Sequence, residues 1–356
     1  MSKQKEQKSS QNTKTIRTES SEIQAKSTKE TKEAVVLLNM GGANSLFEVE
    51  LFLRNMFADP LILRIKNSFI RKFVANIIIN ARLDKLKANY QAIGSKSPLV
   101  EITYNLTQTL SKIDNSRFYT YAMRYTPPYA RNVVADLKER GIQKITLFSM
   151  YPQYSTTTTL SSVRDFMCVL KECDFAPKVE IVESYANDLG YVKSCVERVK
   201  EVQSNFSSDE KFSDFVLLLS THSIPQSVAD SGDIYESEVQ KSAEAIKNEL
   251  NAQGIAFKDI VICYQSKVGP IKWLGPSTID MIKKHRKEKL VIYPLAFTID
   301  NYETEFELEI DNRALADSLG VPKYIVCKCP NATISFANAI VGLILRKKKD
   351  INEASI

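Results

Sequence analysis

Short apolar runs alternate with longer segments of helical periodicity along most of the chain. Runs of four to seven apolar residues, too short for most helices, predict buried strands. Strands that alternate with helices predict parallel sheets of the α/β class, and eight strands predict two four-stranded sheets flanked by helices. The predicted strands are residues 34–39, 118–123, 144–150, 178–182, 215–220, 259–265, 290–293 and 323–328, and the clearest predicted helices are 48–56, 191–203, 236–251 and 278–286.

The chain divides into four predicted parts. Residues 1–33 are rich in Ser, Thr, Lys, Gln and Glu and nearly free of apolar residues, which predicts a disordered tail. Residues 34–200 and 201–330 are expected to form two Rossmann-like domains with one sheet each. Residues 331–350 are expected to form a helix that packs back across both domains. We expect Asn331 to be its N-cap and the cations at 346–349 to favour its C-terminus.

One segment concentrates negative charge. Six carboxylates fall within twelve residues, and those at 303, 307 and 311 would share one face of a helix. The same acids alternate with Phe306, Leu308 and Ile310, as in a half-exposed strand, so periodicity leaves helix and strand open. It also leaves open a solvated acidic face or a row of oxygen donors for a divalent cation in transit. The six are Asp300, Glu303, Glu305, Glu307, Glu309 and Asp311.

A second unusual segment, residues 61–80, mixes apolar and basic side chains. It is too charged to span a bilayer. A helix of this composition can lie in a membrane interface, and it can equally pack on a core, so both interpretations stay open. Its apolar residues are Leu61, Ile62, Leu63, Ile65, Phe69, Ile70, Phe73, Val74, Ile77, Ile78 and Ile79, and its cations are Arg64, Lys66, Arg71 and Lys72.

Composition excludes several classes of protein. The net charge is +6, and the first 33 residues carry +3 of it from eight Lys/Arg and five Asp/Glu. The rest of the chain is therefore only mildly basic, which does not indicate nucleic-acid binding. Six scattered cysteines and no signal peptide predict free thiols and a cytoplasmic location. Cys327 and Cys329 have no further Cys or His after them to complete a zinc site. Gly41 and Gly42 follow the first strand, but the chain lacks both GxGxxG and GxxxxGK[ST], which weakens a nucleotide-binding interpretation.

Polar side chains follow the predicted strands and should converge at the carboxyl ends of the sheets. Of the two histidines, His285 lies in a basic helix end, whereas His222 follows an apolar strand. A single histidine in that position can be structural or catalytic, and the residues alone do not decide between the two.

Several short motifs together resemble the ferrochelatase family, which inserts Fe²⁺ into protoporphyrin IX in the last step of haem synthesis. Each motif is short, but their order and spacing match the family over residues 34–347. The motifs are LNMGG at 38–42, MRY at 123–125, YPQYS at 151–155, STHSIP at 220–225, QSKVGP at 265–270 with WLGP at 273–276, and PLAFTID at 294–300 followed by Glu303 and Thr304.

The resemblance implies a porphyrin held between two Rossmann-like halves. It implies that His222 and Glu303 are catalytic and contact the metal, with His222 as base. It also implies that residues 303–311 form a helix with a widened π-type turn, with Glu307, Asp311 and Asp300 along the metal path. Met40, Arg124 and Tyr125 would line the opposite wall, although the last two could instead belong to the face through which the metal arrives. Further porphyrin-binding residues would be Tyr90, Ser97, Tyr151, Ser155, Tyr235 and Trp273.

The chain departs from the family at two positions. Asn301 stands where many members have histidine, and Thr156 stands where cluster-bearing members have their first cluster cysteine. We therefore expect no iron–sulfur cluster and no other permanently bound cofactor, because Fe²⁺ is a substrate. The alternatives are a coproporphyrin ferrochelatase, a cobalt chelatase acting on a corrin precursor, or a non-catalytic porphyrin or haem carrier. The motif at 265–275 favours protoporphyrin, and we expect a monomer or weak dimer with peripheral contact to the inner face of the membrane through residues 61–80.

Overall fold

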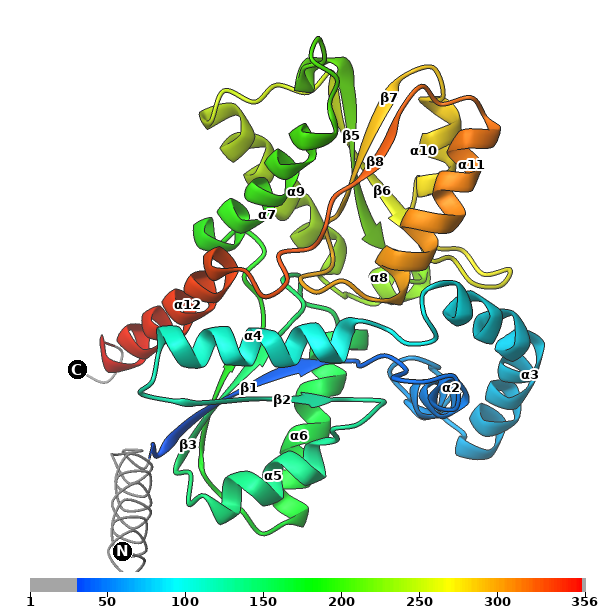
Figure 1. The fold of residues 1–356 in the computed structure, drawn as a ribbon. Coiled ribbons are helices and arrows are strands. Elements are labelled where there is room, and N and C mark those ends of the chain that lie inside the picture. The colour runs from blue at the N-terminus through cyan, green and yellow to red at the C-terminus, as the bar shows by residue number, and fades with distance from the viewer. Residues whose placement is uncertain (1–30, 354–356) are drawn as a thin grey trace, which may run out of the picture.

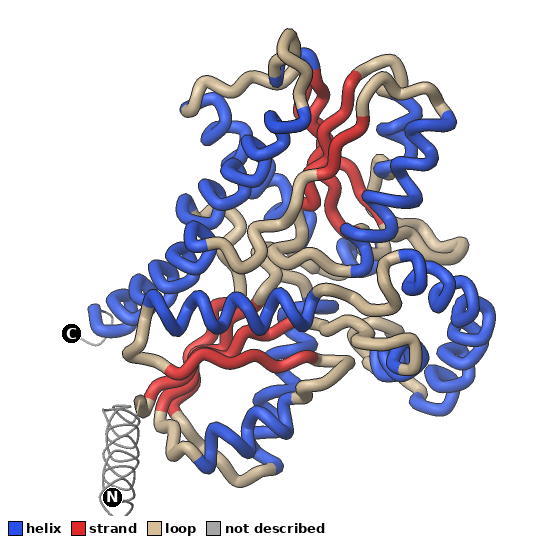
Figure 2. Tube along the Cα trace, viewed as in Figure 1, coloured by secondary structure: helices blue, strands red, loops and turns tan. Residues whose placement is uncertain are grey.

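The computed structural model describes residues 31–353, with side chains through residue 347. The predicted tail therefore lies almost wholly outside the described residues. Helices flank each of two sheets on both faces, so the chain has the α/β architecture predicted from the alternation (Figures 1 and 2).

All eight predicted strands are present, and every strand pair is parallel. The strand order is β2-β1-β3-β4 in the first sheet and β6-β5-β7-β8 in the second. The strands are β1 Glu33–Asn39, β2 Phe118–Met123, β3 Lys144–Ser149, β4 Lys178–Val182, β5 Phe215–His222, β6 Asp259–Gln265, β7 Lys289–Pro294 and β8 Tyr324–Val326. The central strands of parallel sheets are covered on both faces, which is why they read as continuous apolar runs.

The helices form the outer layers and a shared middle layer. The outer face of the first sheet packs on α5 and α6, and the outer face of the second packs on α10 and α11. The inner faces of both sheets join α4, α7, α9 and α12 in one continuous apolar cluster. These helices are α4 Leu99–Ile113, α5 Ala130–Glu139, α6 Ser161–Glu172, α7 Leu189–Glu201, α9 Tyr235–Ala252, α10 Thr278–Lys284, α11 Asn312–Ser318 and α12 Ile334–Glu353.

The start of α12 differs from the prediction. Asn331 is not its N-cap, because it adopts a left-handed φ of 55° and its side chain binds Asp300. Thr333 takes the capping position and accepts the N–H of Phe336 at 3.3 Å. The long-range bond to a buried carboxylate has overridden the local capping signal.

The basic apolar segment is a helix over only part of its predicted range. Asn67 accepts the N–H groups of Phe69 and Ile70, so α3 begins at Ser68 and runs to Ala92. It packs on α2 (Glu48–Ala58) through Ala75 and Ile79, outside the two layered halves (Figure 1). The other face of its first turns is exposed, with Phe69, Ile70, Phe73 and Ile77 each more than half exposed.

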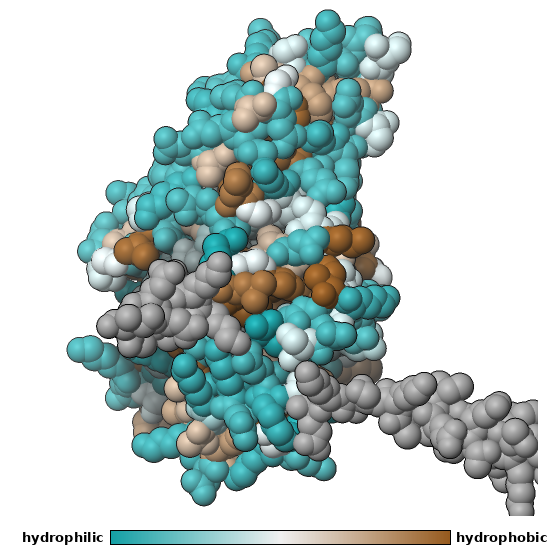
Figure 3. All heavy atoms as spheres, turned by 90° about the vertical axis from the view of Figure 1, so that its left-hand side faces the viewer, coloured by the Kyte–Doolittle hydropathy of each residue, from teal (hydrophilic) through white to brown (hydrophobic). Residues whose placement is uncertain are grey.

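No helix within residues 31–353 combines the length and apolar character needed to cross a bilayer. The side of the molecule that carries α12 is mainly hydrophilic above and below, with a band of apolar side chains near mid-height (Figure 3). The exposed apolar face of α3 lies on the other side of the molecule from α12 (Figure 1).

Candidate active site between the two sheets

The carboxyl ends of the strands bring the predicted residues of both halves together. Met40, after β1, donates its N–H to the Tyr151 hydroxyl at 3.3 Å, and that hydroxyl donates to Asn39 Oδ1 at 2.8 Å. Burial raises the pKa of Tyr151, and the charge of Glu303 adds to this effect. Tyr151 of the first half therefore lies within electrostatic reach of Glu303 of the second half.

His222 ends β5 with its ring orientation fixed. Its Nδ1 lies 2.7 Å from the carbonyl oxygen of Ser223. A carbonyl only accepts, so Nδ1 carries the hydrogen, and in the neutral ring the lone pair is on Nε2. The Tyr235 hydroxyl donates to the backbone oxygen of His222 at 2.9 Å, and it also lies 2.7 Å from the Thr221 hydroxyl. The imidazole is thus held in the tautomer that a general base requires.

Glu303 is a carboxyl group in an unfavourable environment for charge. Burial raises its pKa, and the charge of Glu307 raises it further, whereas His222 acts in the opposite direction. The interaction with His222 places the predicted acid and base within electrostatic reach of each other. A carboxyl that holds its proton more tightly than usual can share protons with a neighbouring imidazole.

The acidic segment is a π-helix, Glu303–Asp311, so the helical alternative holds and the strand is excluded. Its start is fixed by a reciprocal pair, since Thr304 donates its N–H to Asn301 Oδ1 and accepts the Asn301 N–H at 2.9 Å. Asn301 thus has a structural role at the position where many members of the family carry histidine.

The acids of this helix divide into two sets. Glu305 pairs with Lys328 at 2.6 Å and Glu309 with Arg313 at 2.7 Å. Among the described residues, Glu303, Glu307 and Asp311 form no such ion pair. Glu307 instead accepts the N–H of Ser266 at 2.7 Å and a bond from the Ser266 hydroxyl, and Asp311 is exposed.

Asp300 is held apart from this row. It is buried and accepts the N–H of Cys329 at 3.0 Å and the Asn331 amide at 2.7 Å. Its oxygens therefore fix the loop before the π-helix, and its predicted place on a metal path stays a prediction. Within residues 31–353 no group of three or more His, Cys, Asp or Glu side chains is placed to hold a resident metal ion.

An aromatic stack joins the first half to the π-helix. Tyr90, at the end of α3, stacks on Tyr302 with ring centroids 4.9 Å apart, and Tyr302 stacks on Phe306 at 5.6 Å. Asn89 donates to the Tyr302 hydroxyl at 2.9 Å. Ser97 is also buried, and a Cβ on Gly42 would lie 2.7 Å from its hydroxyl, so that glycine permits close packing of the two loops.

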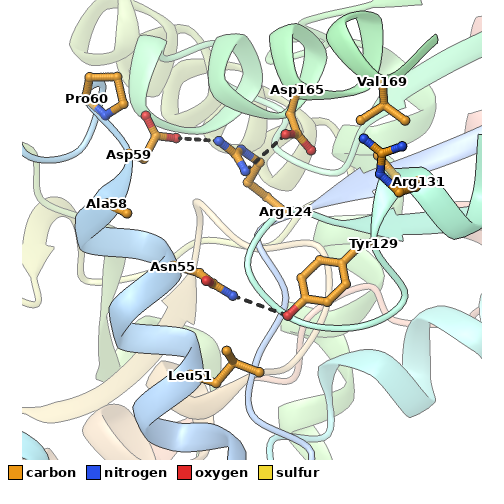
Figure 4. Close-up of a pocket in the computed structure, with 11 residues that line it drawn as sticks. Leu51, Asn55, Ala58, Asp59, Pro60, Arg124, Tyr129, Arg131, Asp165 and Val169 are labelled. Atoms are coloured by element: carbon orange, nitrogen blue, oxygen red, sulfur yellow. Dashed lines mark hydrogen bonds and ion pairs between the residues drawn. The ribbon is translucent and has the colours of Figure 1, made fainter. Parts of the chain in front are cut away.

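Arg124 and Tyr125 direct their side chains to a polar network on the outer side of the first half. The Tyr125 hydroxyl donates to Asp59 at 2.8 Å, and Arg124 lies between Asp59 and Asp165. Arg124 borders a cavity of about 430 Å³ between α2, α5 and α6 (Figure 4). The backbone of Tyr125 supports Met40 through a 2.9 Å bond, and contact of either side chain with porphyrin stays a prediction.

Ser155 and Trp273 occupy positions that connect segments. The Ser155 hydroxyl donates to Asp233 of the second half at 3.0 Å. Trp273 pairs with Pro225, three residues after His222, and its indole donates to the carbonyl of Val268 at 3.0 Å. Sequence reasoning missed Asp233, whose only signal was its place two residues before the predicted Tyr235.

The Ferrochelatase family model matches residues 32–348. The chain belongs to the ferrochelatase family. It is 50% identical over 320 residues to the ferrochelatase of Helicobacter pylori strain HPAG1, covering 90% of this chain and 94% of that one. It is 49% identical over 313 residues to the ferrochelatase of Wolinella succinogenes, covering 88% and 98% of the two chains. The family match spans all eight strands of the two sheets in this chain.

A solved structure supports the fold independently. SirB from Bacillus subtilis with Fe³⁺ superposes with a TM-score of 0.53, covering 89% of this chain and 95% of that chain. The two sequences are only 10% identical, so this similarity concerns the ferrochelatase fold alone.

The environment of Glu303 predicts a pH-dependent gain in stability when its charge is removed. Its pKa is raised in the folded state, so the unfolded chain ionises at lower pH than the native protein. The free energy of unfolding therefore falls as pH rises from the usual glutamate pKa through the raised one. Glu303→Gln has no ionisable group at this position, so its free energy of unfolding does not fall for this reason. We expect the urea midpoint of Glu303→Gln to exceed that of the wild type at pH 8, with the difference vanishing at pH 4.

Glu305→Gln is the matched control for this prediction. Glu305 lies on the same π-helix but is paired with Lys328, so its replacement should not raise stability at either pH. An unchanged or lower midpoint for Glu303→Gln at pH 8 would contradict the argument that its charge is unfavourable.

Proposed function

We propose that the protein is a lyase that inserts Fe²⁺ into protoporphyrin IX to give protohaem. The observation that carries the proposal is that Glu303 interacts electrostatically both with His222 of its own half and with Tyr151 of the opposite half. The Tyr151 hydroxyl accepts the N–H of Met40. Family membership supports porphyrin and iron as the substrates. The presence of the motif at residues 265–275 favours protoporphyrin as the specific porphyrin.

Metallation has to remove two pyrrole protons while the ion loses its water. In the proposed mechanism, His222 Nε2 accepts a pyrrole proton, because Nδ1 is already committed to Ser223. Glu303 takes part in passing protons on, since its raised pKa suits exchange with imidazole. The porphyrin must also distort so that its nitrogen lone pairs meet the incoming ion, and a preformed cleft that fits the distorted ring lowers that barrier.

The unpaired acids of the π-helix support a path for the metal. Glu303, Glu307 and Asp311 lie four residues apart and run from the partly buried start of the helix to its exposed end. Oxygen donors without a competing cation can bind Fe²⁺ briefly and release it, which suits a substrate in transit. Glu307 would act as the intermediate station, held in place by Ser266.

The sequence supports the proposal that no cluster is resident. An iron–sulfur cluster is held by four cysteine thiolates, and Thr156 occupies the position where cluster-bearing members of the family carry the first of these cysteines. A porphyrin or haem carrier, the non-catalytic alternative, would need the pocket but would not need His222 together with Glu303 and the acids behind it.

The decisive test is metallation by the purified protein with His222 intact or replaced. We expect the wild type to metallate protoporphyrin faster than coproporphyrin, and His222→Ala to lose at least about 100-fold in kcat while still binding porphyrin, because only the base is lost. Fluorescence of the free porphyrin measures both binding and turnover. Turnover at half the wild-type rate in the variant would remove His222 from the mechanism, and no metallation of any porphyrin by the wild type would favour a carrier.

The acid row gives a separate kinetic prediction. Glu307→Gln should raise KM for Fe²⁺ about tenfold or more with a smaller change in kcat, because Glu307 acts before the reacting centre. Glu303→Gln should instead nearly abolish kcat. Steady-state kinetics at saturating porphyrin separate the two effects, and Glu309→Gln, whose carboxylate is already paired with Arg313, is the control that should change neither. Equal effects on kcat alone at 303 and 307 would contradict a metal path.

We also propose that the exposed face of α3 binds the surface of anionic membranes. Protoporphyrin and haem dissolve poorly in water, so an enzyme gains by exchanging them with lipid. Phe69 and Phe73 are 82% and 66% exposed. Arg64, just before the helix, donates to Thr156 of the first half and to Ser231 of the second half, which attaches this segment to both halves.

The four cations of the segment are not equivalent. Arg71 donates to the carbonyls of Ala58 and Ile65 and so stabilises the turn before α3. Lys66 and Lys72 are exposed and supply the attraction to lipid that salt would weaken.

Vesicle co-sedimentation tests the membrane proposal. We expect the wild type to bind phosphatidylserine-containing vesicles at low salt and less at high salt, and the Phe69→Ser, Phe73→Ser double variant to bind several-fold less. Ile334→Ser is the control, because Ile334 is 69% exposed but lies at the start of α12 on the other side of the molecule. Equal sedimentation of a folded double variant and the wild type would exclude the membrane role.

A further inference from the structure

We propose that Asp233 is a positioning residue that fixes both walls of the active site relative to each other. Asp233 lies in the second half, between α8 (Gln226–Asp230) and α9, and is 8% exposed. Its two carboxylate oxygens bind different walls. The inference goes beyond the residues assigned to the reaction above, because Asp233 itself contacts none of the atoms proposed to react.

One oxygen of Asp233 binds the first half. Its Oδ2 accepts the N–H of Thr156 at 2.8 Å, the Thr156 hydroxyl at 2.6 Å and the Ser155 hydroxyl at 3.0 Å. These two residues close the segment that begins at Tyr151, whose hydroxyl holds the N–H of Met40. Through this one buried oxygen, Asp233 ties the end of the segment that carries Tyr151 to the second half.

The other oxygen of Asp233 binds the residue that contacts the proposed base. Oδ1 accepts the N–H of Tyr235 at 3.0 Å, which fixes the start of α9. The Tyr235 hydroxyl in turn contacts Thr221 and donates to the backbone oxygen of His222. Asp233 thus reaches His222 through one intervening residue, and Ser155 and Thr156 through direct bonds.

The two oxygens of the Asp233 carboxylate accept from all four of these donors. In Asp233→Asn, an amide oxygen at the Oδ2 position would place the amide nitrogen against the Tyr235 N–H. The reverse orientation would place it against Thr156 and Ser155. Either way a buried donor meets a donor, so the substitution loosens one wall without changing the shape of the side chain.

Glu238 provides a matched comparison within the same interface. It is also 8% exposed and also binds the first half, because its carboxylate accepts the N–H of Tyr154 at 2.8 Å and the Ser184 hydroxyl. Within the described residues, neither of these side-chain hydrogen bonds connects Glu238 to Tyr235 or His222. Glu238→Gln therefore weakens the contact between the halves but not the connection to the base.

The kinetic arm of the test rests on the proposed function. We expect Asp233→Asn to lower kcat by about 10- to 100-fold, because a displacement of ~1 Å of a catalytic group has effects of that size. KM for Fe²⁺ should stay within about twofold of the wild type, since Glu307 is held by Ser266 and not by Asp233. The stoichiometry of porphyrin binding should stay complete, which separates a misplaced base from a reduced fraction of folded protein.

Hydrogen–deuterium exchange is the arm that does not depend on activity. We expect faster exchange in Asp233→Asn both at residues 155–158 and at residues 221–223, and in Glu238→Gln only near residue 154. If the wild type proves inactive, the proposed function fails while this arm still decides the role of Asp233. If Asp233→Asn does not fold, Thr156→Val removes the 2.6 Å contact and should show the same pattern more weakly.

A double-mutant cycle completes the test. Because Asp233 acts on His222 through Tyr235, the effects of Asp233→Asn and Tyr235→Phe on kcat should be clearly less than multiplicative when combined. The proposal is wrong if exchange at residues 221–223 is unchanged, if kcat falls only in proportion to porphyrin-binding stoichiometry, or if the two substitutions act independently.

Discussion

The carboxyl ends of two parallel sheets face each other in this protein, and the buried polar groups there need partners from the opposite half. The Gln153 amide donates to Ser242 at 2.8 Å, and the Thr298 hydroxyl donates to the carbonyl of Met150 at 2.7 Å. The Tyr191 hydroxyl reaches the carbonyl of Leu295 at 3.2 Å. Leaving any of these groups unpaired would cost about 1–3 kcal/mol. The halves are therefore fixed to each other by polar bonds as well as by their shared apolar cluster.

Glu303 differs from these groups because it is a carboxyl group whose charge no Lys or Arg among the described residues neutralises. Its neighbours Glu305 and Glu309 are neutralised by Lys328 and Arg313, whereas its own charge is opposed by burial and by Glu307. A carboxyl with a raised pKa beside a histidine is costly to stability and useful for moving protons. The π-helix fits this interpretation, since widened helical turns are rare and occur often at functional sites.

The parts of the fold that sequence predicted are those set by local pattern. The strands were found because burial on both faces makes each a continuous apolar run, as in 215–220. The acidic segment stayed ambiguous because its alternation with Phe306, Leu308 and Ile310 imitates a strand, and only the family resemblance indicated a helix. Contacts between distant segments left no local trace. Thr156 and Asp233 are 77 positions apart, and the bond between Asn331 and Asp300 moved the start of α12.

The helix α3 connects the surface of the molecule to the acids of the site. Its first turns expose Phe69 and Phe73, and its last turn carries Tyr90, which stacks on Tyr302, the residue before Glu303. Its 25 residues have a contour length of roughly 37 Å at 1.5 Å per residue. One continuous helix therefore joins the exposed apolar face to the aromatic stack beside the π-helix. The start of α3 is held by Arg71, which donates to the carbonyls of Ala58 and Ile65, and its end is held by the contact of Tyr90 with Tyr302.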